Sequence, residues 1–312
     1  MRLSIPMDSL RQRFGDKLQE NVHLSNYTTA RVGGPAAALL IAHSSQELAD
    51  TCSALWEYDL PCHVLGSGSN VLASDDGVDA VIVINRAHAV RIDVHSDPPT
   101  VWAESGANLG GVARQAALRG LSGLEWAATI PGTIGGAVYG NAGAHGGDMQ
   151  GILLVAEILH RSSGKSAWSC EQMNYSYRSS ALKAQPGQAV ILAARMKLSG
   201  SSRDEVQARM NNFSSRRRVT QPTGASLGSM FKNPPGDYAG RLIEAAGLKG
   251  ARVGGAEISS IHANFFINAG NATSRDIYAL IRKTQEAVHQ KFGVLLELEI
   301  ELIGNWPEMA AK

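Results

Sequence analysis

A cluster of glycines in the middle of the chain is the first chemical signal in the sequence. Seven of the 33 glycines lie between Gly132 and Gly147, a density unsuited to a helix or strand interior. Bare backbone can be approached closely by a phosphate or a flat cofactor. The interleaved Ile130 and Ile134 would line a site for a heteroaromatic ring with a diphosphate tail. A loop that is merely rich in turns is the alternative.

Two further glycine segments resemble phosphate-binding loops. Residues 66–70, Gly-Ser-Gly-Ser-Asn, follow a predicted strand, and their backbone N–H groups could wrap a pyrophosphate. Val71 stands where a dinucleotide fingerprint needs its third glycine, which excludes a Rossmann fold. Residues 164–166, Gly-Lys-Ser, match the end of a P-loop, but Leu159 replaces its first glycine, so a hairpin turn is predicted there.

Three polar features could move protons or bind anions. Ser229 lies in a glycine-rich stretch, but neither a GxSxG motif nor a His/Asp spacing supports a hydrolase triad. Arg178 lies between serines and tyrosines and is by default an exposed arginine. Glutamates 297, 299 and 301 alternate with apolar residues on a predicted strand over residues 294–303. That pattern by itself favours the solvated face of an antiparallel sheet.

Alternating strand and helix patterns must position these residues. Asp237 and Gly247 are predicted to cap one helix, and Thr273 with Asp276 forms a predicted capping box for another that ends before Gly293. Residues 199–224 hold the best candidate domain boundary. Helices are predicted over residues 8–21, 45–58, 108–119 and 203–218, and strands over 37–42, 62–65, 78–85, 90–94, 100–104, 153–160 and 190–198.

Composition excludes several classes of protein. The chain has 29 basic and 28 acidic residues, so no bulk field attracts nucleic acid or a membrane. The three cysteines lack the spacing of a metal site or a disulfide framework, so we predict neither. Charges interrupt the first twenty residues, and no apolar run reaches ~18 residues. We therefore expect a globular cytoplasmic protein.

In combination, the motifs resemble one family almost from end to end. That family is the UDP-N-acetylenolpyruvoylglucosamine reductases, and the short stretch around Arg178 is similar to its shorter form, which lacks an extra capping loop. The motifs that carry the resemblance are residues 27–35, 66–70, 130–139, 141–143, 177–179, 228–234, 239–244 and 262–264, together with the final predicted strand.

The resemblance implies a fold, cofactors and a reaction. The fold is α+β: a two-part FAD-binding fold of the vanillyl-alcohol oxidase type, residues 1–86 and 87–202, and a C-terminal α/β substrate-binding domain, residues 203–312. The expected enzyme is a monomer that uses NADPH and FAD to reduce the enolpyruvyl ether of UDP-N-acetylglucosamine enolpyruvate to UDP-N-acetylmuramate. This reaction serves peptidoglycan synthesis, and through it cell wall biogenesis, cell shape and cell division.

The resemblance also assigns roles to residues. Ser229 would donate a proton to C2 of the substrate, Arg178 would stabilise the developing enolate, and Glu299 would orient the substrate. Substrate contacts are carried over to Tyr177, Lys232, Asn233 and His262. FAD contacts are carried over to Arg31, Gly66, Ser67, Gly68, Ser69, Asn70, Pro131, Gly132, Gly135, Gly136, Asn141 and Ala142.

One departure from the family pattern and two alternative functions accompany this interpretation. Many members have an arginine where this chain has Glu301, so Arg217, Arg218 or Lys232 would have to supply the cation. An FAD-dependent oxidase or dehydrogenase on the same fold is one alternative, although it would lack the motif around Ser229. A flavin-free sugar-nucleotide-binding protein is the other, and a colourless purified protein would support it.

Overall fold

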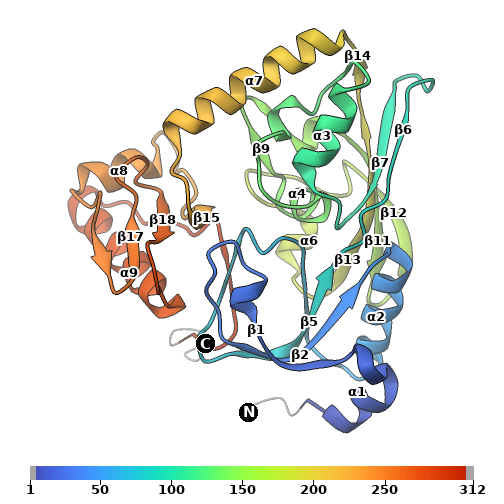
Figure 1. Ribbon diagram of the computed structural model, residues 1–312, viewed down its shortest axis with the longest axis horizontal. Helices are drawn as coiled ribbons and strands as arrows, with labels where there is room; N and C mark the ends of the chain where they lie inside the picture. Colours follow the sequence, from blue (N-terminus) through green and yellow to red (C-terminus); the bar gives the residue numbers. More distant parts are fainter. Residues whose placement is uncertain (1–4, 307–312) are drawn as a thin grey trace. The chain divides into compact units, whose positions relative to one another are not determined.

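The computed structural model describes residues 5–306 and shows a mixed α+β chain (Figure 1). Two compact units make up the chain. Unit 1 comprises Met1–Leu39, Ser67–Ala80 and Arg218–Lys312, and unit 2 comprises Leu40–Gly66 and Val81–Arg217. None of the helices within the described residues is long and apolar enough to cross a membrane.

Unit 2 is built on a five-stranded antiparallel sheet with the order β12-β11-β13-β7-β6. Helices α2 and α4 contact the long central strand β13. The hairpin predicted at Gly164 is confirmed, since His160 pairs with Gly164 where β11 turns into β12. The elements are α2 (Ser45–Glu57), β3 (Cys62–Leu65), β6 (Val90–Asp93), β7 (Thr100–Glu104), α3 (Leu109–Ala117), β8 (Leu121–Ser122), η3 (Glu125–Ala127), α4 (Ile134–Gly140), β9 (Gly143–Ala144), β10 (Gly147–Asp148), α5 (Met149–Ile152), β11 (Leu153–His160), β12 (Gly164–Ser169), α6 (Ala181–Ala184), β13 (Ala189–Lys197) and β14 (Ser199–Gly200).

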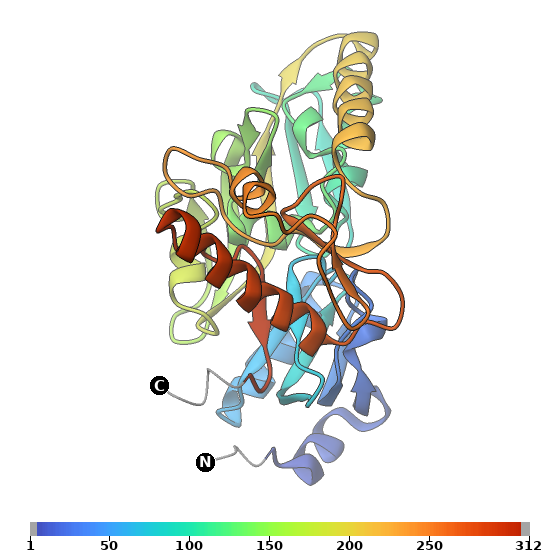
Figure 2. The same ribbon diagram turned by 90° about the vertical axis from the view of Figure 1, so that its left-hand side faces the viewer.

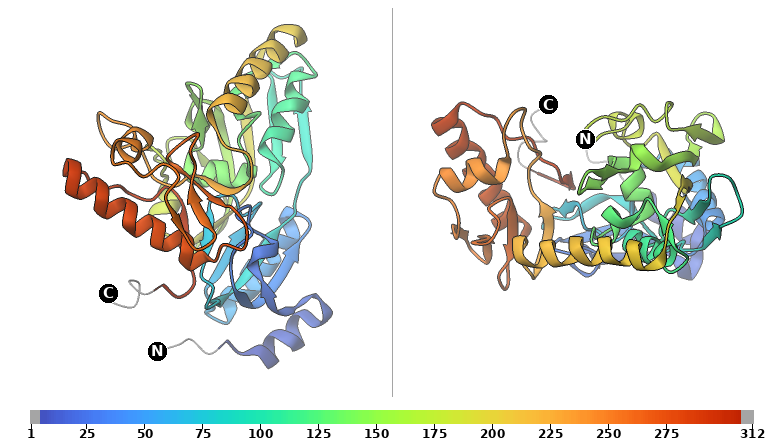
Figure 3. Two further views of the ribbon diagram at one scale, coloured as in Figure 1. Left: turned by 60° about the vertical axis from the view of Figure 1, so that its left-hand side comes forward. Right: turned by 90° about the horizontal axis from the view of Figure 1, so that it is seen from above.

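Helix α7 (Arg203–Thr220) is held on unit 2 over most of its length. Val206 and Met210 on its buried face pack against Ala117 of α3. Figure 3 (right) shows α7 running alongside the green elements of unit 2. The basic stretch predicted as a helix is therefore confirmed, and apolar contacts fix its first half.

Unit 1 contains a four-stranded antiparallel sheet with the order β15-β18-β17-β16. Helix α9 packs against β16 and β17 and contacts α8 (Figure 2). The predicted capping box is confirmed: Thr273 and Asp276 exchange hydrogen bonds, and Gly293 at φ 68° caps the other end of α9. The elements are α1 (Met7–Phe14), η1 (Gly15–Lys17), β1 (Gln19–His23), η2 (Leu24–Asn26), β4 (Val71–Ala73), β15 (Ala225–Ser229), α8 (Ala239–Ala245), β16 (Arg252–Val253), β17 (Ala256–Ile258), β18 (Phe265–Asn268), α9 (Ser274–Phe292) and β19 (Glu301–Ile303).

Strands β2 (Pro35–Ala42) and β5 (Val78–Asn85) belong partly to each unit. They are the central strands of a sheet with the order β1-β2-β5-β3. Within this sheet β1 runs antiparallel to β2, whereas β3 runs parallel to β5. The apolar runs predicted strands over residues 37–42, 62–65 and 78–85. The structure confirms them as β2, β3 and β5 of this sheet.

Three predicted elements are wrong in extent. The first helix ends at Phe14 rather than at residue 21, because Gly15 takes φ 54° and residues 19–23 pair with β2 instead. Helix α8 begins after Tyr238, since the Asp237 carboxylate accepts the Tyr238 N–H and binds Arg241. Its last residue is Ala245 and its C-cap is Ala246, one residue before the predicted Gly247 cap.

The strand predicted over residues 294–303 is also shorter than expected. Only β19 forms a ladder, and it runs parallel to β4 rather than within an antiparallel sheet. Residues 294–300 make a single bridge, between Leu298 and Phe231. Glu297 is exposed, but Glu299 and Glu301 are half-buried, so the solvated-face interpretation fails for these two.

Candidate active site

Ser229 is the last residue of β15 and is displaced by a bulge. The pairing with β18 shifts register between Ser226 and Ser229, and Ser229 lies opposite Phe265. Gly228 has a φ of 75°, a conformation that costs side-chain-bearing residues about 1–2 kcal/mol. Bulges are known to re-aim a side chain beside an active site. The glycine before Ser229 is therefore required by the backbone.

The segment after Ser229 is hydrogen-bonded to the segment that carries Glu299. The Glu299 N–H donates to the Met230 carbonyl at 2.9 Å, and the Lys232 N–H donates to the Glu297 carbonyl at 2.9 Å. Phe231, which lies between these bonds, is 1% exposed. The structure thus places the predicted proton donor and the predicted orienting carboxylate on neighbouring backbone segments of unit 1.

A cavity of about 420 Å³ opens in unit 1 beside Ser229. Three residues predicted from the sequence line it together, Ser229, Asn233 and His262. Tyr238, which is 69% exposed, contributes an aromatic ring to the same cavity. The complete lining is Ser229, Asn233, Tyr238, Gly240, Arg241, Glu244, Ile261, His262, Ala263 and Asn264.

His262 is held in the neutral form within this lining. Burial lowers its pKa and Lys249 lowers it further, against the opposing effects of a hydrogen bond to its own backbone and of Glu244. Its Nδ1 accepts the Asn264 N–H at 3.2 Å, which assigns the ring proton to Nε2. A Cβ on Gly240 would lie 3.1 Å from the ring, so this glycine lets the imidazole rest on α8. A neutral hydrogen-bond donor therefore lines the cavity.

Lys232 and Asn233 have structural partners as well as predicted substrate contacts. The Asn233 side-chain oxygen accepts the Ala239 N–H at 3.1 Å and so ties this loop to the start of α8. The Lys232 ammonium forms an ion pair with Glu297 at 3.2 Å. Both residues are consequently fixed near Ser229 by contacts within unit 1.

The predicted FAD loop of unit 1 is bonded to the segment that carries Glu299. Gly68 has φ 59°, and a Cβ there would lie 2.0 Å from the Tyr27 carbonyl oxygen, so the loop requires this glycine. The Asn70 side chain donates to the Glu299 carbonyl at 3.1 Å, and the Asn70 carbonyl accepts the Glu301 N–H at 2.8 Å. Arg31, also predicted to contact FAD, is exposed and has φ 57°.

The remaining predicted FAD contacts lie in unit 2, around α4. A Cβ on Gly66 would lie 2.5 Å from the Thr133 hydroxyl, and one on Gly135 would lie 2.9 Å from the Ser105 Cβ. Gly132 has φ 134°. These glycines are thus explained by the protein's own packing and backbone. Pro131 precedes them in the same segment.

Gly136 differs from these glycines. Its φ is not positive, and an added Cβ would make only an ordinary contact, 3.7 Å from the Thr133 hydroxyl. Glycine in a helix costs about 1 kcal/mol relative to alanine, so neither packing nor conformation accounts for it. Bare backbone next to open space fits a bound flat group, and the residues present therefore fit FAD.

Asn141 and Ala142 close the end of α4. Asn141 is 5% exposed, has φ 46° and caps the helix. Its side chain donates to the Ser176 carbonyl at 3.2 Å and accepts the Gln150 N–H at 3.0 Å. The Ala142 N–H donates to the Ala137 carbonyl at 2.9 Å. Asn141 thereby links the predicted FAD segment to the loop that carries Arg178.

Arg178 and Tyr177 form a small cationic and aromatic pair in unit 2. The Arg178 guanidinium donates to the Gly143 carbonyl at 3.0 Å and lies 5.1 Å from the centre of the Tyr177 ring. Tyr177 is 52% exposed, and Arg178 has φ 57°. The structure thus joins Arg178 to the glycine-rich segment, while Ser229 and Glu299 belong to unit 1.

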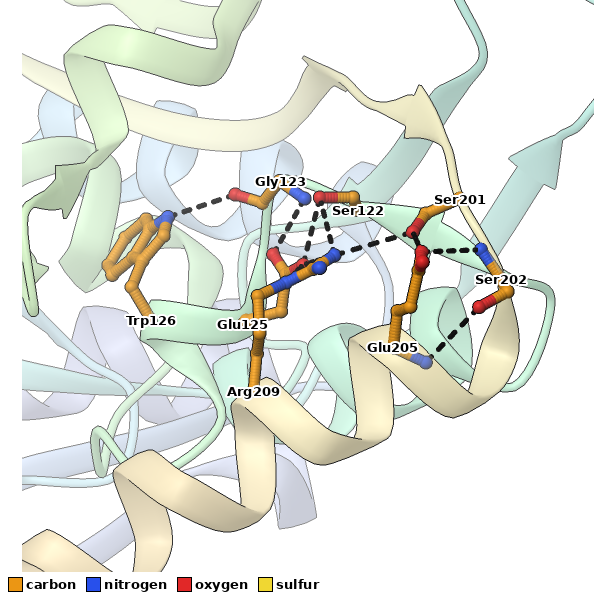
Figure 4. Close-up of polar contacts among 8 residues, drawn as sticks. All are labelled: Ser122, Gly123, Glu125, Trp126, Ser201, Ser202, Glu205 and Arg209. Carbon is orange, nitrogen blue, oxygen red and sulfur yellow. Dashed lines mark hydrogen bonds and ion pairs between the residues drawn. The ribbon is translucent and has the colours of Figure 1, made fainter.

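A buried carboxylate beside the glycine-rich segment was not predicted (Figure 4). Glu125 accepts hydrogen bonds from the Gly123 N–H at 2.7 Å, the Ser122 hydroxyl at 2.8 Å and Arg209 of α7 at 2.9 Å. Burial raises its pKa, but these bonds outweigh that effect and hold the pKa below its ordinary value. The contacts fix the turn that leads toward Pro131. Nothing in local spacing indicates this role, because Arg209 is 84 residues away.

Known protein families match both parts of the chain. Residues 36–164 match a family described as an FAD binding domain, and residues 220–303 match the UDP-N-acetylenolpyruvoylglucosamine reductase C-terminal domain. Together with the glycine-rich segments, these matches define an FAD-containing oxidoreductase that carries this type of C-terminal domain. The predicted fold class and the FAD cofactor are thereby confirmed.

Individual relatives agree over nearly the whole length. A UDP-N-acetylenolpyruvoylglucosamine reductase of Chloroflexus aggregans is 41% identical over 92% of this chain and 97% of its own, and one of Bacillus velezensis is 40% identical over 96% and 98%. The crystal structure of the Thermus caldophilus reductase superposes with a TM-score of 0.78 at 36% identity, covering 93% of this chain and all of that one. The chain belongs to the UDP-N-acetylenolpyruvoylglucosamine reductase family.

Proposed function

We propose that the protein reduces the enolpyruvyl ether of UDP-N-acetylglucosamine enolpyruvate to UDP-N-acetylmuramate, with NADPH as reductant. Family membership over both parts of the chain supports this reaction. The observation that carries it is the shared cavity of Ser229, Asn233 and His262, with the Glu299 backbone bonded to the residue after Ser229. This arrangement suits proton delivery to a sugar nucleotide in unit 1.

The reaction assigns a distinct task to each proposed catalytic residue. Ser229 donates its hydroxyl proton to C2 of the enolpyruvyl group. A serine hydroxyl is a weak acid, so the proton moves only as charge develops at C2. Arg178 balances the charge that grows on the substrate carboxylate, and Glu299 orients the substrate. Tyr177, Lys232, Asn233 and His262 contact the substrate.

The glycine-rich segments would hold FAD chiefly through backbone. The proposed contacts in unit 1 are Arg31, Ser67, Gly68, Ser69 and Asn70. Those in unit 2 are Gly66, Pro131, Gly132, Gly135, Gly136, Asn141 and Ala142. A flavin bound by these residues would supply the hydride that C3 of the enolpyruvyl group receives. The bare backbone at Gly136 is the structural feature that favours such a group.

Lys232 is the proposed replacement for the arginine that many family members have at position 301. It belongs to the same unit as Glu301 and lies on the segment bonded to Glu297. Arg217, the other partly buried candidate, donates to the Thr129 carbonyl in unit 2. Lys232 therefore combines a cation with a fixed place beside Ser229.

The proposed activity also gives the protein its wider setting. NADPH and sugar nucleotides are cytoplasmic metabolites, so we infer a cytoplasmic protein that acts in peptidoglycan synthesis. We propose that it acts as a monomer, as the resemblance to the family implies. Cell wall biogenesis, cell shape and cell division would depend on its product. The functional division proposed from the sequence, residues 1–86, 87–202 and 203–312, assigns FAD to the first two parts and the sugar nucleotide to the third.

Anaerobic stopped-flow absorbance tests the proposal. The FAD-loaded protein is mixed first with NADPH and then with UDP-N-acetylglucosamine enolpyruvate while the visible flavin band is followed. NADPH should bleach the band and the substrate should restore it. Ser229→Ala should slow the second phase by about 10²–10⁴-fold, the usual contribution of a general acid. Ser226→Ala, a serine on the same strand, is the matched control and should leave both phases unchanged.

Each other outcome favours a different function. Bleaching that only oxygen reverses would support an FAD-dependent oxidase or dehydrogenase. A protein that takes up no flavin yet binds the sugar nucleotide would support the flavin-free binding protein. Normal reoxidation in Ser229→Ala would remove Ser229 as the proton donor while leaving the overall reaction in place.

A further inference from the structure

The side chain of Asn264 holds both backbone polar groups of Phe231, two residues after Ser229. Its amide nitrogen donates to the Phe231 carbonyl at 2.8 Å, and its oxygen accepts the Phe231 N–H at 2.9 Å. The Asn264 carbonyl also accepts the Met230 N–H at 2.8 Å. Asn264 is 3% exposed and Phe231 is 1% exposed, so water does not replace these bonds.

These bonds hold residues 230 and 231, which follow Ser229 in the chain and lie next to the backbone of residues 297–299. The Met230 carbonyl accepts the Glu299 N–H, and the Met230 N–H donates to the Asn264 backbone carbonyl. Phe231 is held by Asn264 on one side and forms a bridge with Leu298 on the other. Rotation of either peptide would therefore move Ser229 relative to Glu299.

The ladder alone does not fix this segment. Ser229 is the last residue of β15, and a bulge interrupts its pairing with β18. Packing of the Phe231 ring edge-on against Phe266, with centroids 6.0 Å apart, restrains the side chain but bonds no backbone group. Beyond the end of the β15–β18 pairing, the Asn264 side-chain amide supplies the hydrogen bonds to the Phe231 backbone.

We propose that Asn264 is a positioning residue that sets the place of the Ser229 hydroxyl for proton transfer. This inference rests on the proposed function, because it acts through Ser229. We call the two hydrogen bonds between the Asn264 side chain and the Phe231 backbone the Asn264 clamp. Loss of this clamp leaves the buried N–H and C=O of Phe231 without partners and lets residues 229–232 shift. A displacement of about 1 Å can cost roughly 10²-fold in rate.

Two variants remove the clamp in steps. Asn264→Asp keeps an acceptor for the Phe231 N–H but lacks the donor to the Phe231 carbonyl, and Asn264→Leu removes both. Substrate-driven flavin reoxidation should slow by about 10-fold in the first and about 100-fold in the second. Reduction by NADPH, which does not use Ser229, should stay within about twofold. Asn268→Asp is the matched control, since Asn268 also bonds backbone groups from β18 but none in residues 229–232.

A double-mutant cycle separates positioning from general structural damage. If Asn264 acts through Ser229, Asn264→Asp should add no further slowing in a Ser229→Ala background. Equal slowing in both backgrounds, or equal slowing of both half-reactions, would overturn the proposal. Additive loss is what a merely structural role predicts.

Amide hydrogen exchange gives a readout that needs no reaction. The Phe231 N–H should exchange much faster in Asn264→Leu than in the wild type but should stay protected in Asn264→Asp, which keeps its acceptor, with the Ile258 N–H as an internal reference on β17. Unchanged exchange of the Phe231 N–H in Asn264→Leu would overturn the clamp, and slow exchange of the Ile258 N–H in the same sample shows that the variant is folded. Failure of wild-type reoxidation by the sugar nucleotide would instead overturn the proposed function and leave the exchange result standing.

Discussion

Gly136 and Gly111 occupy equivalent positions at the starts of two helices. Each is the third helical residue, and each donates its N–H to the side chain of the N-cap, Thr133 for Gly136 and Asn108 for Gly111. Neither has a positive φ. Only Gly136 lies in the segment predicted to contact FAD. A substitution at Gly111 therefore reports the effect on helix stability alone, whereas the same substitution at Gly136 also reports the effect on FAD binding.

Gly136→Ala is predicted to leave the flavin-free protein as stable as the wild type or more stable by about 0.5–1 kcal/mol, because alanine favours a helix. The same change should weaken FAD binding at least tenfold, since the methyl group occupies bare backbone facing the predicted site. Chemical denaturation and fluorescence titration with FAD measure the two effects. Gly111→Ala should leave FAD affinity unchanged. Equal FAD affinity in both variants would contradict an FAD contact at Gly136.

Gly228→Ala is predicted to destabilise the protein and slow proton transfer together. Its φ of 75° costs an alanine about 1–2 kcal/mol, and relief of that strain would rotate the peptide before Ser229. Gly247 has φ 77° and, like Gly228, open space around an added Cβ, so Gly247→Ala should lose similar stability. Stopped-flow reoxidation should slow only in Gly228→Ala. The same rate in both variants would mean that the bulge does not aim Ser229.

Glu125→Gln is predicted to lower the free energy of unfolding at pH 7 by about 2 kcal/mol, the typical value of hydrogen bonds to a buried charged group. The pKa of Glu125 is depressed in the folded state, so its stabilisation is complete above the ordinary value of 4.5 and is lost as the pH falls through the folded value. The two proteins should therefore converge in urea denaturation at acidic pH. Glu205→Gln removes an exposed carboxylate of the same cluster and should have a much smaller effect. A difference that persists at acidic pH would argue against this linkage.

His262 is predicted to titrate below its ordinary pKa of 6.5 in the folded protein, chiefly because it is buried. A depressed histidine pKa means that the unfolded chain binds protons more readily, so stability falls as the pH drops below about 6.5. NMR of the imidazole against pH measures the midpoint, and nitrogen shifts should report the proton on Nε2. His262→Gln should remove this part of the pH dependence. A midpoint at or above 6.5 would show that the ring is not held neutral.

Local patterns in the sequence predicted most of the fold. The apolar runs at residues 62–65 and 78–85 and the Thr273 capping box match the structure because each is decided by neighbours in the chain. The extent of the last strand was wrong, since alternation continues over residues 294–300 while hydrogen-bonding partners do not. Alternation of apolar and polar residues indicates which side chains are buried. A β-ladder also requires a second strand to hydrogen-bond with, and the alternation carries no information about that strand.

The sequence predicted candidate site residues but not the contacts that hold them in place. The glycine-rich segments indicated a cofactor site, and the resemblance to the family assigned Ser229 its role. The Asn264 clamp and the bond between Glu125 and Arg209 join residues 33 and 84 positions apart, and local sequence holds no record of such contacts. Asparagine and glutamate are common on surfaces, so only the fold distinguishes these two.

The hydrogen bond between Asn70 and Glu299 joins residues 229 positions apart, so its two partners are synthesised at different times. At ribosomal rates of 5–20 residues per second, the loop of residues 66–70 waits roughly 10 to 50 s for the strand that holds it. Unit 2 is complete once Arg217 has been made, whereas β4 then still lacks its parallel partner β19. The bonds from residues 70–73 to residues 299–303 can therefore form only near the end of synthesis.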